Sequence, residues 1–252
     1  MRRKRVLDVA SLLTLPLGVV IVLAAQWLEG GAPRALLQGP AALIVFGGTC
    51  AAVLVSYSPR EVGRALRAVA ATFERITDDT DVLMSRLVAI ASRAHRKGLM
   101  SLETEIGDID HRLLRDGLTL IVDGTSIEVL RDMVATERRA READEEMPAR
   151  VFEAAAGYAP TLGILGAVLG LIEVMHHLTE PAALGSGIAV AFVATVYGVG
   201  AANLLFLPLA GRIRERAAFA GRRRDLVAEA LFAIHARTNP RLVAHKLKVL
   251  SA

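Results

Sequence analysis

Four long stretches without a charged residue constrain this chain more than any other feature of its sequence. They run about from 9 to 28, 35 to 59, 154 to 172 and 181 to 211. Each is close to the ~20 residues that a helix needs to cross ~30 Å of hydrocarbon. The chain is 53% hydrophobic and yet 22% charged, which is compatible with membrane insertion because the charges lie between these stretches. We therefore predict four membrane spans rather than four buried helices of a soluble protein.

The basic residues around these stretches predict the orientation of the chain. Residues 2–5 are all basic, Arg34 is the one base between the first two stretches, and no Lys or Arg separates the last two. Loops rich in Lys and Arg stay on the cytoplasmic side. Both termini and the long middle segment are thus expected in the cytoplasm. The first stretch is too long for a secretory signal peptide and lacks a small-x-small cleavage site, so we interpret it as a span.

The predicted fold is an all-α integral membrane protein with four transmembrane helices, two plus two. A helical cytoplasmic domain is inserted between spans two and three. The domains are a hairpin at 1–58, a cytoplasmic domain at 59–150, a second hairpin at 151–211 and a basic tail at 212–252, with spans at about 6–28, 35–57, 152–175 and 184–210. The tail carries ten basic and three acidic residues, a balance suited to anionic lipid headgroups rather than nucleic acid.

Small residues follow one face of each of the last two spans. In span three they are Ala159, Gly163, Gly166 and Gly170, and in span four Gly187, Ala191, Thr195, Gly198 and Ala202. Steps of three and four residues place them on one helical side, where they let another helix backbone approach closely. The Gly47–Gly48 pair in span two is either a packing notch or a kink.

Catalytic chemistry finds little support in this sequence. Nucleophile-elbow, Walker and zinc-protease motifs are missing, and Cys50 is the single cysteine. We therefore expect that the protein is not an enzyme, binds no cofactor and holds no metal cluster. The glycines at 163, 166 and 170 do not form a nucleotide loop, because they lie inside an apolar helix without a preceding strand. His176 and His177 diverge by about 100° on a helix and are interpreted as surface residues.

Acidic residues are missing from the middle of every span. Glu173 lies within a turn or two of the outer boundary, and an acid so close to a span is a functional candidate, although it could reach water there. A proton-binding carboxylate would therefore have to come from a partner. Thr195 lies mid-span, where its hydroxyl either bonds back to its own helix or has a function. Pro160 removes a backbone donor, which frees a carbonyl one turn earlier and creates a hinge.

Several motifs resemble the MotA/PomA family of flagellar motor stator proteins, within the MotA/TolQ/ExbB proton channel superfamily. They are Gly47-Gly-Thr and Val55-Ser-Tyr57 in span two, the segment 159–171 (APTLGILGAVLGL) in span three, and Ala189-Val-Ala191, Thr195-Val-Tyr-Gly198 and the segment 202–211 (ANLLFLPLAG) in span four. The resemblance implies an inner-membrane homopentamer around two MotB-type single-span chains. By the same resemblance, the aspartate of these partner chains is expected to carry the ion, and ion passage is expected to turn the pentamer round the partner and push the rotor protein FliG.

The resemblance also assigns roles to individual residues. Pro160 and Pro208 match two prolines that couple conformation to ion passage, Thr195 matches a threonine near the partner's aspartate, and Thr161 and Tyr197 join this set of ion-pathway candidates. A rotor-facing patch would comprise His95, Arg96, Lys97, Glu103 and Glu105. On the residues alone, an ordinary solvated helix face is the preferred interpretation of that patch.

Ala167 stands where sodium-type members of the family carry a threonine. Because a hard cation needs several oxygen ligands, this difference favours H⁺ over Na⁺ as the transported ion. Two other functions remain open at this point. One is an ExbB/TolQ-type energiser of a periplasm-spanning partner, which usually has three spans, and the other is a non-conducting membrane scaffold.

Overall fold

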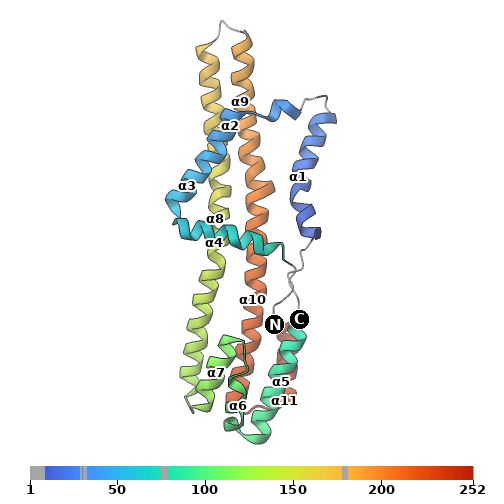
Figure 1. The fold of residues 1–252 in the computed structure, drawn as a ribbon, viewed down its shortest axis with the longest axis vertical. Coiled ribbons are helices and arrows are strands. Elements are labelled where there is room, and N and C mark those ends of the chain that lie inside the picture. Colours follow the sequence, from blue (N-terminus) through green and yellow to red (C-terminus); the bar gives the residue numbers. More distant parts are fainter. Residues whose placement is uncertain (1–8, 29, 31–32, 75–78, 178–180, 252) are drawn as a thin grey trace. The chain divides into compact units, whose positions relative to one another are not determined.

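The structure is a computed structural model that describes residues 9–28, 30, 33–74, 79–177 and 181–251. Helices make up almost all of these residues, and they contain no β-strand (Figure 1). The chain divides into two compact units. We call Met1–Arg75 with Glu146–Arg214 the span unit, and Ile76–Glu145 with Glu215–Ala252 the bundle unit. The basic start at 2–5 and the predicted beginning of span one at residue 6 lie outside the described residues.

The span unit consists of apolar helices and one amphipathic helix. Its elements are α1 (Val9–Leu28), η1 (Pro33–Leu36), α2 (Gly39–Ala42), η2 (Leu43–Gly47), α3 (Gly48–Ser56), α4 (Pro59–Thr72), the later part of α8 (Ile127–His176), α9 (Pro181–Gly200), η4 (Ala201–Phe206) and the first turns of α10 (Leu207–His235). Among the described residues, three helical stretches are long and apolar enough to cross a membrane: Gly39–Ser56, one within α8, and one beginning at Leu184. The apolar segment Pro16–Leu28 of α1 is shorter.

Span two begins later than the expected residue 35. A separate 3-10 turn occupies Pro33–Leu36, and the helix starts at Gly39 with Pro40 in its first turn. Proline suits that position because its missing N–H is not needed there. The Gly47–Gly48 pair fits both predicted roles: residues 43–47 form a π-helical turn, and a Cβ on Gly48 would lie 3.1 Å from the Leu162 side chain.

Helix α8 runs without interruption from Ile127 to His176, through Pro148 and Pro160. The sequence predicted a helix that ended near Met147 and a new one in the membrane. Packing explains the difference: Ala149, Val151 and Phe152 are buried in one cluster with residues of α10. That contact offsets the backbone hydrogen bond that Pro148 removes.

The bundle unit is built from shorter helices around one hydrophobic core. They are α5 (Thr80–Lys97), η3 (Leu99–Leu102), α6 (Glu103–Ile106), α7 (Arg112–Val122), the beginning of α8, the end of α10 and α11 (Pro240–Ser251). The predicted breaks at Gly98 and Gly124 are present, and both glycines have positive φ.

The unit boundaries differ from the predicted 59–150 and 212–252. Helix α4 belongs to the span unit, and the tail from residue 215 belongs to the same unit as residues 76–145. The reason is hydrophobic: Leu226, Leu231, Ile234 and Leu247 of the tail are almost fully buried in one core with residues of α5 and α7. Charge counting could not reveal this, because the number of charges in the tail does not show which apolar face it buries.

Candidate functional site

The contact between α8 and α9 brings two helix backbones together (Figure 1). A Cβ placed on Gly163 would lie 2.8 Å from the carbonyl oxygen of Ala194, and one on Gly198 would lie 2.6 Å from that of Ala159. A Cβ placed on Gly170 would lie 2.8 Å from the carbonyl oxygen of Gly187. The structure therefore places these small residues where two spans touch, and no side chain fits between them.

Gly166 extends this surface to span two. Its Cβ would meet the Ala194 methyl at 2.7 Å and Ile44 at 3.4 Å. Ala159 is completely buried in a cluster with Ala41, Val45 and Ala194. Spans two, three and four thus form one close-packed set, while Ile164, Phe192 and other apolar side chains on their outer faces remain exposed in this single chain.

Thr161 and Thr195 lie on faces of α8 and α9 that this chain leaves exposed. The Thr195 hydroxyl donates to the carbonyl of Ala191 at 3.3 Å, and the Thr161 hydroxyl donates to that of Tyr158 at 2.8 Å. Thr195 therefore forms the hydrogen bond to its own helix, which was one of the two alternatives given by the sequence. Each hydroxyl oxygen still has lone pairs with which to accept a hydrogen bond from another group.

Pro160 lies at the α8–α9 contact, because its Cα would be 3.1 Å from a Cβ on Gly198. Pro160 has no N–H to donate to the carbonyl of Ala156, which is a buried residue. Pro208 is exposed and follows the π-helical turn η4, which includes its own i−4 residue, Leu204. Ala167 is half-buried.

Tyr197 does not join Thr195, although both were assigned to the ion pathway. Its hydroxyl donates to the carbonyl of Leu36 and accepts from the N–H of Gln38 at 3.4 Å, and its ring lies 5.6 Å from that of Phe46. Residues two apart on a helix point about 200° apart. Tyr197 therefore holds the start of span two against α9 and faces away from Thr195.

Thr49 is a buried polar residue that sequence reasoning did not single out. It is 3% exposed, and its hydroxyl has no hydrogen-bond partner among the described residues. A buried hydroxyl without a partner costs free energy. The signal available in the sequence was its place in the Gly47-Gly48-Thr49 motif in the middle of a span.

Glu173 lies at the end of α8 and is exposed. The Nδ1 of His177 is 3.3 Å from its carboxylate. No group of three or more metal-ligating side chains gathers in the described part of the chain. The Nδ1 of His177 also lies 3.1 Å from the backbone carbonyl oxygen of Glu173, so Glu173 is a solvent-accessible residue that contacts His177 near a span terminus.

The five residues of the predicted rotor patch do not all share one environment in the structure. Arg96, Lys97 and Glu103 are exposed at the junction of α5 and α6. Glu105 instead pairs with Arg93, a residue that the motif did not include. His95 is hydrogen-bonded to the carbonyl of Arg237 at 3.0 Å, so it ties α5 to the loop before α11.

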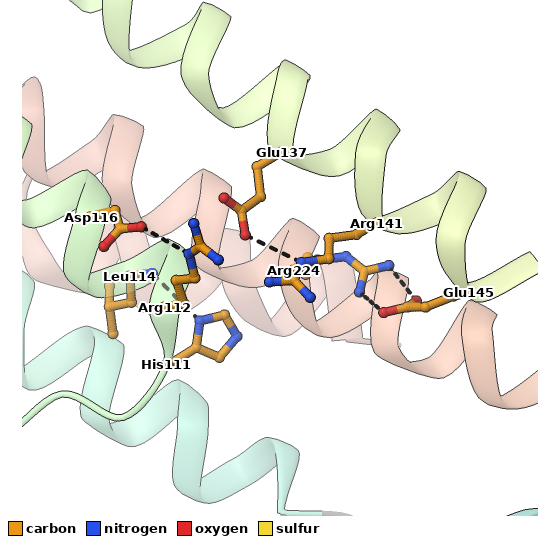
Figure 2. Close-up of polar contacts among 8 residues, drawn as sticks. All are labelled: His111, Arg112, Leu114, Asp116, Glu137, Arg141, Glu145 and Arg224. Atoms are coloured by element: carbon orange, nitrogen blue, oxygen red, sulfur yellow. Dashed lines mark hydrogen bonds and ion pairs between the residues drawn. The ribbon is translucent and has the colours of Figure 1, made fainter. Parts of the chain in front are cut away.

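An ion-pair network joins the charged half of α8 to its neighbours in the bundle unit (Figure 2). The guanidinium of Arg224 on α10 bonds both oxygens of Glu145 at 2.6 and 2.8 Å. Arg224 is 9% exposed, whereas the Glu145 side chain is 31% exposed, so this pair is partly shielded from water. On the surface of α8, Arg141 and Glu137 form a looser pair at 3.4 Å.

His111 caps the start of α7 beside this network (Figure 2). Its Nδ1 accepts the N–H of Leu114 at 3.4 Å. Burial lowers the pKa of His111 below its usual 6.5, and the positive charges of Arg223 and Arg224 lower it further, while Glu137 opposes them. The folded state therefore favours the neutral ring, which is the form that can accept this hydrogen bond.

We expect His111→Asn to remove a pH dependence of stability. A depressed histidine pKa stabilises the fold fully above the unfolded pKa of 6.5, and this contribution is lost as the pH falls through the lower folded value. Asparagine keeps a cap but does not titrate, whereas His111→Ala should lose about 1 kcal/mol at neutral pH. Thermal unfolding of the full chain in detergent between about pH 5 and pH 8 checks this. A wild-type midpoint that falls no more steeply than that of His111→Asn would contradict it.

The fold and this site define a multi-pass membrane protein that carries a helical domain and whose close-packed spans have no Asp or Glu within residues 154–172 and 181–211. The model of the MotA/TolQ/ExbB proton channel family matches residues 105–224. The motility protein A of Bacillus subtilis (strain 168) is 32% identical over 242 residues, which cover 96% of this chain and 90% of that protein. The chemotaxis protein PomA of Vibrio alginolyticus is 28% identical, with 96% of this chain and 94% of that protein covered.

Solved structures agree with these relatives. MotAB of C. jejuni superposes with a TM-score of 0.87 at 27% identity, covering 96% of this chain and 95% of the other. The flagellar MotAB stator complex of Bacillus subtilis gives a TM-score of 0.83 at 31% identity, with the same coverage. The chain belongs to the MotA/PomA family of flagellar motor stator proteins. It is thus a multi-pass membrane protein and a stator subunit, rather than a member of a known enzyme class.

Proposed function

We propose that this stator subunit forms the walls of a proton path whose carboxylate comes from a MotB-type single-span partner. The observation that carries the proposal is the α8–α9 pair. It is packed backbone to backbone, has no Asp or Glu within residues 154–172 and 181–211, and exposes the hydroxyls of Thr161 and Thr195. Such walls can guide a carboxylate without themselves holding a charge.

The proposed assembly has five copies of the chain around two partner chains, in the inner membrane, with both termini in the cytoplasm. The exposed apolar faces of α8 and α9 support it, since Ile164 is 61% and Phe192 72% exposed in one chain. Apolar area of this extent inside a span is covered by lipid or by other helices. Torque would pass to the rotor protein FliG through the exposed Arg96, Lys97 and Glu103.

The proposed ion is H⁺. The half-buried Ala167 offers a methyl group where a sodium path would need an oxygen ligand. Swimming speed should therefore remain unchanged when Na⁺ is replaced by K⁺ at constant proton-motive force. Motility that stops in sodium-free medium would contradict this assignment.

Pro160→Ala tests the coupling role of the α8–α9 contact. Alanine restores a backbone N–H, which can donate to the carbonyl of Ala156 and stiffen the helix. We expect normal protein levels in the membrane and near-complete loss of rotation in tethered cells. Pro148→Ala is the matched control, because it restores an N–H in the same helix outside the close contact, and it should rotate.

A scaffold that conducts no ions predicts the opposite result. Pro160→Ala cells that rotate at wild-type speed, with the protein present at normal levels, would exclude the coupling role. Thr195→Val adds a second test, because it removes the hydroxyl and nearly keeps the side-chain volume. A scaffold would tolerate it, whereas a proton path would slow or stop.

A further inference from the structure

Helix α4 begins at the point where span two ends. Ser56 is the last residue of α3, and Pro59 is the first of α4. Ser58 and Glu61 form a capping box between them, in which the Glu61 carboxylate accepts from both the N–H and the hydroxyl of Ser58 at 2.8 Å. Figure 1 shows α4 running across α8 and α10 rather than along them. The helix therefore lies close to the boundary of the span instead of continuing away from it.

One face of α4 is packed against the spans. Ala65 is 1% exposed and lies in the buried cluster that contains Phe152, Leu209 and Ile213. Val62 and Val69 pack partly buried against the same cluster. This apolar contact fixes the rotation of α4 about its own axis.

The opposite face of α4 carries three arginines. Arg60, Arg64 and Arg67 are four and three residues apart, so they share one side of the helix, and all are exposed. Leu66 lies between the two faces and is 62% exposed. An arginine face beside an exposed leucine is typical of a helix that lies in the membrane interface.

A cleft of about 670 Å³ lies along the arginine face. It is lined by Ser58, Pro59, Arg60, Glu61, Gly63, Arg64 and Arg67. The space around Gly63 is open, because a Cβ there would meet no atom within 4 Å. Glu61 is the one acid of the lining; its carboxylate accepts two hydrogen bonds from Ser58 and also attracts Arg64.

We propose that Arg60, Arg64 and Arg67 bind the phosphate group of an anionic phospholipid in this cleft. A guanidinium matches phosphate geometry and can bond two oxygens at once. The end of a span is the depth at which lipid phosphates lie, and Leu66 can extend toward their acyl chains. Charge complementarity selects a lipid with net negative charge, such as phosphatidylglycerol, over zwitterionic phosphatidylcholine. This proposed lipid site does not depend on the proposed proton path.

Native mass spectrometry of the full chain in detergent tests the site. The purified protein is titrated with phosphatidylglycerol or phosphatidylcholine, and the bound lipids are counted. We expect preferential binding of phosphatidylglycerol, weakened about tenfold or more by Arg60→Gln/Arg67→Gln. Arg115→Gln/Arg139→Gln is the control, because it removes the same charge from exposed positions in the bundle unit.

Gly63 provides a second pair of variants that keeps the helix folded. Gly63→Glu places a carboxylate among the arginines without a steric clash and should abolish the preference for phosphatidylglycerol. Gly63→Ala should retain it, since the open cleft accepts a methyl group. Equal binding of the two lipids by the wild type, or an unchanged preference in Gly63→Glu, would overturn the proposal. So would competition by millimolar inorganic phosphate, which would indicate a site for soluble phosphate.

Discussion

Gly198→Ala is expected to abolish motility, whereas Gly200→Ala, two residues further along the same helix, should be tolerated. An alanine Cβ at 198 would lie 2.6 Å from the carbonyl oxygen of Ala159 and 3.1 Å from the Cα of Pro160. Both neighbours are backbone atoms that no change of rotamer can move. The helices would have to separate, at a cost of about 1–3 kcal/mol for each overpacked position. A Cβ on Gly200 meets nothing within 4 Å.

Soft-agar motility and co-purification with a MotB-type partner separate two causes of this loss. Loss of both would indicate that the contact is needed for assembly. Loss of motility alone would indicate that it is needed for movement within an assembled stator. Gly163→Ala should behave like Gly198→Ala, because its Cβ would lie 2.8 Å from the Ala194 carbonyl oxygen. Wild-type swimming by either variant would contradict the backbone contact.

Arg224→Met is expected to destabilise the bundle unit by about 1–2 kcal/mol. The side chain of Arg224 is 11% exposed and that of Glu145 is 31% exposed, and the change leaves the Glu145 carboxylate without the two hydrogen bonds that it accepts at 2.6 and 2.8 Å. Removing one partner of a partly buried pair leaves a charge that water compensates only in part. Arg112→Met is the control, because both side chains of its pair with Asp116 are more exposed, at 65% and 41%, and the loss should matter by less than about 1 kcal/mol.

Hydrogen exchange of the full chain in detergent can measure this effect locally. Amides of α5 and α7 should lose protection in Arg224→Met, while those of α9 should not, because the pair lies within the bundle unit. Adding Glu145→Leu should restore part of the protection by removing the unpaired acid. If Arg224→Met alone kept the wild-type protection against hydrogen exchange, solvent would already screen the Glu145 charge.

The membrane hairpin of spans three and four could be read from the chain itself. Charge-free runs, small residues every three or four positions and Pro160 are local patterns, and hydrocarbon tolerates few alternatives to a helix. The structure placed Ala159, Gly163 and Gly198 where that periodicity put them. It also showed that the Thr195 hydroxyl bonds to Ala191, a choice that residue type alone left open.

The site residues outside the hairpin depended on neighbours far along the chain. Tyr197 faces Leu36, and Glu105 pairs with Arg93 instead of joining the exposed Arg96 and Lys97. No sequence motif identifies Leu36 or Arg93 as the partner. A helical wheel gives the direction of a side chain but not the element that it meets.

Hydrophobic length, charge placement and small-residue spacing act within single segments, so they specify an all-helical membrane protein, and the motifs of the chain resemble the stator family. How the segments join depends on tertiary contacts: α8 continues through Pro148, α4 packs on the spans, and the tail completes the bundle core. Those outcomes rest on which apolar faces bury one another. Such burial depends on contacts between distant residues, and no pattern within one segment specifies them.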